Sequence, residues 1–183
     1  MRIATCIFFL GTVIATGATH ADHAFKLNSA DALDNQPLKP AQVFNGFGCH
    51  GGNRSPQLEW SGAPAGTKSF AVTIYDPDAP TGSGWWHWVV YNLPASASKL
   101  DAGVGQQGKL PPGAEHGRND YGRFDFGGAC PPEGDKPHRY VFTVHALKVD
   151  KIEVPKDASA ALIGYMINAN RIGAATLTAT YGR

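Results

Sequence analysis

Short hydrophobic runs separated by turn-forming residues make up this chain from Phe25 onward. The runs are rich in β-branched and aromatic residues and are bounded by Gly, Pro, Asn and Asp clusters, which is typical of antiparallel sandwiches and barrels. Four runs are expected to form the core sheets, and a fifth, which alternates apolar and polar residues, is expected to be the final strand. These predicted strands are 58–61, 69–75, 86–93, 140–147 and 177–181.

One segment, from about Ser159 to Ile172, has the spacing of an amphipathic helix. Asp157 or Ser159 can cap its start, and Gly173 can supply a left-handed stop. Its apolar positions are expected to face the sheet, and they are Leu162, Ile163, Met166, Ile167 and Ile172. The stretch 94–137, by contrast, is long and loaded with Gly, Pro and charged residues, so function is expected there.

The first 21 residues have the pattern of a secretory signal peptide. One basic residue precedes an apolar stretch that is too short to span a bilayer, and small residues then flank His20. Cleavage after Ala21 would leave residues 22–183 as a single mature domain with no transmembrane segment, periplasmic or secreted. The plain alternative is that this run is a buried N-terminal helix or strand.

Cysteine usage and charge narrow the picture further. Cys6 leaves with the signal, and the remaining Cys49 and Cys130 are expected to form a disulfide in an oxidising compartment; two buried free thiols are the alternative. The mature chain carries 15 basic and 15 acidic residues, scattered singly. Nucleic-acid binding normally needs a concentrated positive face, so that class of partner is discounted.

Two rigid, proline-containing segments adjoin predicted strands. The first, Asp76-Pro77-Asp78-Ala79-Pro80, follows a strand directly, and His87 returns beside it after the turn 82–84. The second runs from Cys130-Pro131-Pro132 to His138-Arg139-Tyr140, which begins another strand. Two such strand ends side by side are expected to make a small pocket.

These segments resemble the phosphatidylethanolamine-binding protein family. The match is closest to its bacterial, Raf-kinase-inhibitor-like branch, because three further fragments are similar and the resemblance runs from about residue 25 to residue 182. Those fragments are Phe47-Gly48-Cys49, the segment from Gly51 to Trp60, and Gly117-Arg118-Asn119-Asp120-Tyr121-Gly122. One departure is Ala129, where this branch is expected to have a proline, and its absence suggests a less rigid loop.

The resemblance implies a mainly β fold, a Greek-key sandwich of two antiparallel sheets with one or two short peripheral helices. It also implies a pocket for phosphate, phosphorylated head groups or similar small anions, with no cofactor. The protein could also inhibit or regulate a protein partner, and it could form a homodimer. The residues that match the family motifs are Asp76, Asp78, His87, Cys130, Pro131, His138 and Tyr140.

A carboxylate in contact with an anion would repel it, so Asp76 is not expected to be a direct ligand. The hypothesis is that Asp76 accepts a hydrogen bond from an imidazole, fixes its tautomer and favours its charged form, so that His87 and His138 offer N–H donors to the anion. Loop amides near Ala129 and Cys130 could add donors. Anion affinity should then rise as the pH falls through about 6.5.

Plain structural alternatives stand beside these roles. The two acids could form an Asx turn, Arg139 could pair with a nearby acid, and the loop 118–120 could be structural. The remaining histidines, His50, His116 and His145, and the four tryptophans are expected to be packing residues. A second function class is a metal-dependent hydrolase that uses Asp76, His87 and His138, although no familiar metal or nucleophile motif is present.

Overall fold

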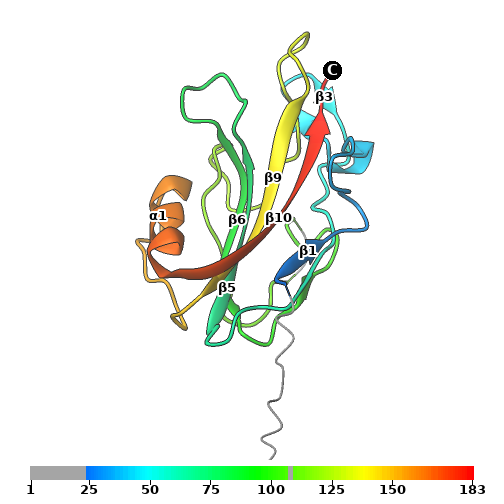
Figure 1. Ribbon diagram of the computed structural model, residues 1–183. Helices are drawn as coiled ribbons and strands as arrows, with labels where there is room; N and C mark the ends of the chain where they lie inside the picture. The colour runs from blue at the N-terminus through cyan, green and yellow to red at the C-terminus, as the bar shows by residue number, and fades with distance from the viewer. Residues whose placement is uncertain (1–23, 107–108) are drawn as a thin grey trace, which may run out of the picture.

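The computed structural model describes residues 24–106 and 109–183, so the predicted signal peptide lies outside the described residues. Antiparallel strands form a five-stranded sheet in the order β10-β9-β5-β6-β8, a three-stranded sheet in the order β1-β4-β7, and the hairpin β2-β3 (Figure 1). The strands are β1 Lys26–Asn28, β2 Asn45–Gly46, β3 Cys49–His50, β4 Leu58–Ser61, β5 Ser69–Asp76, β6 Trp85–Pro94, β7 Lys99–Leu100, β8 Glu115–His116, β9 His138–Leu147 and β10 Arg171–Tyr181. A 3-10 turn, η1 Pro40–Gln42, and the helix α1 Ala160–Asn170 complete the fold, which confirms the predicted mainly β class.

The five-stranded sheet is covered on both faces because side chains alternate along its strands. In β5, Phe70, Val72 and Ile74 join the core shared with the three-stranded sheet, while Ala71 faces the second core under α1. Trp60 of β4 packs on Phe70 with ring centroids 5.5 Å apart, which joins the two sheets. The predicted strands 58–61, 69–75, 86–93 and 140–147 are all present, and 177–181 is the end of a longer strand, β10.

Helix α1 lies against the face of the sheet opposite β1 (Figure 1). Ser159 caps it as expected, because its hydroxyl accepts a hydrogen bond from Leu162 N at 3.2 Å. Ile163 and Ile167 are buried, but Leu162 is 41% exposed and Ile172 39% exposed, so the predicted apolar face was too wide. The left-handed stop at Gly173 was also wrong, because the chain passes from the helix into β10 at the extended Arg171.

No helix in residues 24–106 and 109–183 is both long and apolar enough to cross a membrane.

A bulge at the start of β6 determines where His87 points. Ile74 of β5 pairs with Trp88, whereas the next residue, Tyr75, pairs with Trp86, so His87 is the extra residue on β6. Trp86 therefore faces the helix side, and both His87 and Trp88 point to the opposite side. Without the bulge, strict alternation would place His87 and Trp88 on opposite faces.

The outer edge of β10 is partly covered by the segment 34–38. Asn35 N donates to Thr178 O at 2.7 Å, Leu38 N donates to Thr180 O at 2.8 Å, and Thr180 N donates to Gln36 O at 3.0 Å. The side chain of Asp34 accepts a further hydrogen bond from Thr178 N at 2.7 Å. The end of β10 thus has backbone partners on both sides.

The predicted disulfide between Cys49 and Cys130 is confirmed, with an S–S distance of 2.11 Å. It joins the β2-β3 hairpin to the loop that leads into β9. The alternative of two free thiols is therefore wrong. In Figure 1 the hairpin lies beside the C-terminal end of β10, and Arg183 contacts it there by donating to Gly48 O at 3.2 Å.

Candidate functional site

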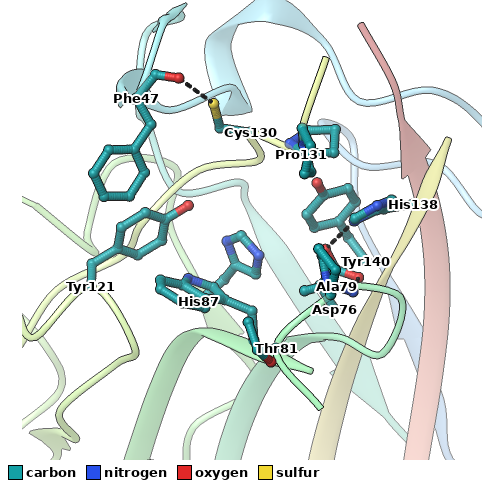
Figure 2. Close-up of a pocket in the computed structure, with 13 residues that line it drawn as sticks. Phe47, Asp76, Ala79, Thr81, His87, Tyr121, Cys130, Pro131, His138 and Tyr140 are labelled. Carbon is teal, nitrogen blue, oxygen red and sulfur yellow. Dashed lines mark hydrogen bonds and ion pairs between the residues drawn. The ribbon is translucent and has the colours of Figure 1, made fainter. Parts of the chain in front are cut away.

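The two rigid segments meet at one end of the sandwich, around a cavity of about 210 Å³. Asp76 ends β5, and His138 and Tyr140 begin β9 at alternate positions, so all three point to the same side of the sheet. The bulge of β6 adds His87 to them (Figure 2). The cavity is lined by Phe47, Asp76, Ala79, Pro80, Thr81, Trp85, His87, Tyr121, Cys130, Pro131, Pro132, His138 and Tyr140.

The carboxylate of Asp76 is buried, and its own neighbours satisfy it. Its Oδ1 accepts hydrogen bonds from Asp78 N at 2.8 Å and from Ala79 N at 3.1 Å, and its Oδ2 accepts one from His138 Nδ1 at 2.8 Å. The Asx turn and the imidazole contact, which were weighed as alternatives, therefore coexist. This geometry fits the hypothesis that Asp76 orients a histidine and does not touch a ligand.

His138 is held between two carboxylates. Besides its bond to Asp76, its Nε2 lies 3.4 Å from Asp135 Oδ2, and the imidazole is 5% exposed whereas Asp135 is 43% exposed. His138 thus lies between the cavity and a surface groove formed by Asp78, Asp135, Lys136, Pro137 and Arg139. The two contacts fix the plane of the ring.

The imidazole of His87 stands in the middle of the cavity, between Tyr121 and Tyr140 (Figure 2). Its ring meets theirs edge-on, at centroid distances of 5.7 Å and 5.1 Å. Nδ1 lies 2.8 Å from Gly127 O, and burial lowers the pKa of His87 to about 4. His87 is therefore neutral near pH 7, contrary to the prediction that it offers a charged donor in that range.

Tyr140 supplies a buried hydroxyl that has no hydrogen-bond partner among the residues that the structure describes. Burial together with the charge of Asp76 raises the pKa of this phenol well above its usual value. The group therefore stays protonated and can donate to a ligand. Because an unpaired buried hydroxyl is costly, its presence beside a cavity favours a polar occupant.

Phe47 and Tyr121 form the outer wall of the cavity, and the sequence analysis did not select them as site residues. Their rings stack at 5.8 Å, and Phe47, at the tip of the β2-β3 hairpin, is 70% exposed with a backbone φ of +53°. Both lie in fragments that carried the family resemblance. The available signal was the disulfide, which fixes the Phe47 hairpin beside Cys130.

The loop 118–122 is structural, and it positions Tyr121. Asn119 is buried and donates to Asp125 O at 2.9 Å, while Asp120 Oδ2 accepts a hydrogen bond from Trp86 N at 2.7 Å. Tyr121 in turn donates to Gly128 O at 2.8 Å. The loop therefore holds both the start of β6 and one wall of the cavity.

Backbone hydrogen bonds hold Ala129 in position, whereas a proline ring would have stiffened the chain there. Its N–H donates to Gln42 O at 3.1 Å, and its carbonyl accepts from Phe44 N at 2.9 Å. A proline could not make the first of these bonds. The expected loss of rigidity at this position was therefore wrong, and the Ala129 amide is not free to bind an anion.

Asp78 is the one predicted site residue that does not line the cavity. Its carboxylate pairs with Arg139, at 2.7 Å to Nη2 and 2.9 Å to Nε, and this contact lowers the pKa of Asp78 to about 2. The ion pair lies in the surface groove beside His138. The plain alternative for Arg139, pairing with a nearby acid, is confirmed.

Two of the three remaining histidines pack as expected, His116 and His145, whereas the expectation was wrong for His50. His116 Nδ1 accepts from Trp88 Nε1 at 3.1 Å, His145 Nε2 lies 3.0 Å from Thr73 Oγ1, and His50 is exposed on β3. Trp60 and Trp88 are buried in the core.

Asp76, His87 and His138 do not form a metal site. Both ring nitrogens of His138 face carboxylates, Nδ1 that of Asp76 and Nε2 that of Asp135, so neither is turned toward His87 as a free metal ligand. Among the residues that the structure describes, no group of three or more His, Cys, Asp or Glu side chains is placed to hold a metal ion.

Comparison with known proteins gives one consistent family. A sequence model described as Phosphatidylethanolamine-binding protein matches residues 28–182. UPF0098 protein YbcL of Escherichia coli is 59% identical over 160 residues, which cover 86% of this chain and 87% of that protein. UPF0098 protein YbhB of the same organism is 49% identical over 157 residues, which cover 85% of this chain and 99% of that protein.

Two further comparisons concern a solved structure and a lipoprotein. The crystal structure of YbcL, described as a new member of the mammalian PEBP family, superposes with a TM-score of 0.85 at 56% identity, covering 87% of this chain and 98% of that one. A putative lipoprotein of Mycobacterium tuberculosis, LppC, is 34% identical over 171 residues, which cover 93% of this chain and 78% of that protein.

Proposed function

Since the chain belongs to the phosphatidylethanolamine-binding protein family, we propose that it binds phosphate or phosphorylated head groups in the cavity at the ends of β5, β6 and β9. The observation that carries this proposal is the buried hydroxyl of Tyr140, which lines the cavity and has no partner within residues 24–106 and 109–183. A phosphoryl oxygen would satisfy it.

The other residues that match the family motifs take different roles in this proposal. His87 and Tyr140 face the ligand directly, and Cys130 and Pro131 form the rim. Asp76 acts through His138, because all of its hydrogen bonds go to protein groups. Asp78 stays outside the cavity and acts only by holding Arg139 at the start of β9.

We also propose that the protein acts outside the cytoplasm, as a single domain of residues 22–183 after removal of the signal. The Cys49–Cys130 disulfide supports an oxidising compartment, and the relative LppC is named a lipoprotein. A ligand-controlled contact with a partner protein, or with a second copy of the chain, would suit such a role. The chain is proposed as a binding protein and not as a metal-dependent hydrolase.

Calorimetric titration of residues 22–183 with inorganic phosphate and with phosphoethanolamine tests the binding proposal. Tyr140→Phe should weaken binding about fivefold to tenfold, because it removes one hydrogen bond to the ligand, and should leave the melting temperature unchanged or higher. Tyr165→Phe, which alters an exposed tyrosine of α1, is the matched control. Equal affinities in the Tyr140 variant and the wild type would contradict the proposed site.

A further inference from the structure

The hydrogen-bonding state of His87 follows from its contacts. A carbonyl oxygen can only accept a hydrogen bond, so the Nδ1 that lies 2.8 Å from Gly127 O carries a proton. In a neutral imidazole the other nitrogen, Nε2, is then an acceptor. His87 is 3% exposed as a residue and lines the cavity, so its second nitrogen is available to a ligand there.

The groups that face His87 leave it neutral. Desolvation by burial is the largest influence and lowers its pKa, and His138 on β9 acts in the same direction. Asp76 on β5 and the carbonyls of Gly127 and Gly128 oppose this without overcoming it, since the pKa stays at about 4. The rings of Tyr121 and Tyr140, both protonated phenols, complete its surroundings.

The cavity also lacks a fixed cation. Among the described residues that line it there is no lysine or arginine. Two guanidinium groups that contact neighbours of the cavity are engaged with protein groups: Arg139 pairs with Asp78, and Arg183 donates to Pro131 O at 2.8 Å. With Asp76 buried close by, each additional negative charge on a ligand raises the cost of binding.

We propose that the cavity takes a phosphomonoester or inorganic phosphate as its monoanion, with His87 Nε2 accepting the hydrogen of the P–OH group and Tyr140 donating to a phosphoryl oxygen. This inference rests on the proposed function and narrows its ligand class. A phosphodiester and sulfate have no such hydrogen at neutral pH, so both leave His87 without a partner. His87 is therefore the residue that selects a ligand whose phosphate group is protonated.

A matched ligand pair tests the inference by titration calorimetry at pH 5.5. Methyl phosphate and dimethyl phosphate are both monoanions there, and only the first has a P–OH group. Dimethyl phosphate should bind about tenfold more weakly, because it leaves the acceptor His87 Nε2 unpaired. The affinity for methyl phosphate should also fall as the pH rises past about 6, where such esters lose their second proton.

His87→Asn is the matched variant, because an asparagine amide can still donate to Gly127 O while the acceptor Nε2 is removed. It should bind methyl and dimethyl phosphate with similar, weak affinity. A ³¹P spectrum of methyl phosphate bound to the wild-type protein at pH 7 should keep the chemical shift of the monoanion. That measurement needs no variant and therefore does not depend on how His87→Asn folds.

The outcomes separate the two proposals. Equal binding of methyl and dimethyl phosphate, or a bound dianion in the ³¹P spectrum, would overturn the inference and leave the proposed function intact. Binding of ethanolamine without phosphate would also overturn it, because an ammonium group would then be the donor to Nε2. Absence of binding by all the phosphates would contradict the proposed function itself.

Discussion

At the scale of single residues, one group of side chains in the site orients its neighbours, and a different group faces the cavity. Asp76 carries the charge that an anion would avoid, yet each of its oxygens is already engaged by protein donors. In the Asx turn, one carboxylate oxygen of Asp76 accepts hydrogen bonds from backbone amides, and the other oxygen bonds His138. The negative charge thus fixes the orientation of an imidazole, and in the proposed binding mode the contacts to the ligand come from the neutral groups of His87 and Tyr140.

Phe47 offers a test of the cavity wall that should cost little stability. Its φ of +53° is unfavourable for a residue with a side chain, so Phe47→Gly relieves strain while it loses the stacking on Tyr121. We expect a free energy of unfolding within about 1 kcal/mol of the wild type and a several-fold loss of affinity for methyl phosphate. Urea denaturation and calorimetry measure the two effects.

Phe124→Ala is the control for this variant, because Phe124 is 48% exposed and does not line the cavity. Its affinity should match that of the wild type. Undiminished binding by Phe47→Gly would show that the exposed ring is not part of the site.

The positions of the strands were the most predictable feature of this molecule, and the bulges within the strands were the least predictable. Alternation and β-branched residues located β4, β5, β6 and β9, because each buries at least one face. Periodicity could not locate the bulge that turns His87 into the cavity, since a bulge depends on pairing with β5. The motif found His87, whereas its hydrogen-bond partner, Gly127, is set by a loop far away in the sequence.

Helix α1 shows the same limit in its packing. Spacing alone placed Leu162 and Ile163 on one apolar face, but only Ile163 is buried in the structure. Ile163→Ala should therefore lower the free energy of unfolding by about 2–4 kcal/mol, through lost burial and a cavity. Leu162→Ala should change it by less than about 0.5 kcal/mol.

Urea denaturation of the two helix variants checks this difference. Alanine favours helix at both positions, so helix propensity does not separate them. Equal losses of stability would mean that the helix packs through a wider face than its burial indicates.

The β2-β3 hairpin depends on the disulfide for its place in the site. Cys49→Ala combined with Cys130→Ala releases a constraint across 81 residues and should cost about 4 kcal/mol of stability. The same double variant should weaken phosphate binding, because Phe47 and the rim at Cys130 lose their covalent link. Thermal melts and titrations with and without reductant measure both, and only the wild type should respond to reductant. A double variant that binds as tightly as the wild type would contradict this role.

At the scale of the whole molecule, buried neutral histidines make stability depend on pH. Burial lowers the pKa values of His87 and His145 to about 4, whereas both titrate near 6.5 in the unfolded chain. Between these values the unfolded state binds more protons, so stability is complete above about pH 6.5 and is lost as the pH falls toward 4. Each histidine should contribute a slope of about 1.4 kcal/mol per pH unit in that window.

His145→Gln isolates one of these contributions, because His145 lies away from the cavity beside Thr73. Urea denaturation at several pH values between 4.5 and 6.5 should show a shallower loss of stability for this variant than for the wild type. Phe124→Ala, which alters an exposed side chain that carries no ionisable group, should keep the wild-type slope. Parallel curves for His145→Gln and the wild type would contradict the prediction.

The segment that covers the end of β10 has a consequence for solution behaviour. A long outer strand with free amides and carbonyls is a template on which a second molecule can add its own strand. Residues 34–38 already occupy those groups next to Thr178 and Thr180, and Pro37 interrupts the new outer edge. The chain thereby protects itself against open-ended fibrous stacking at the very edge that lies nearest its C-terminus.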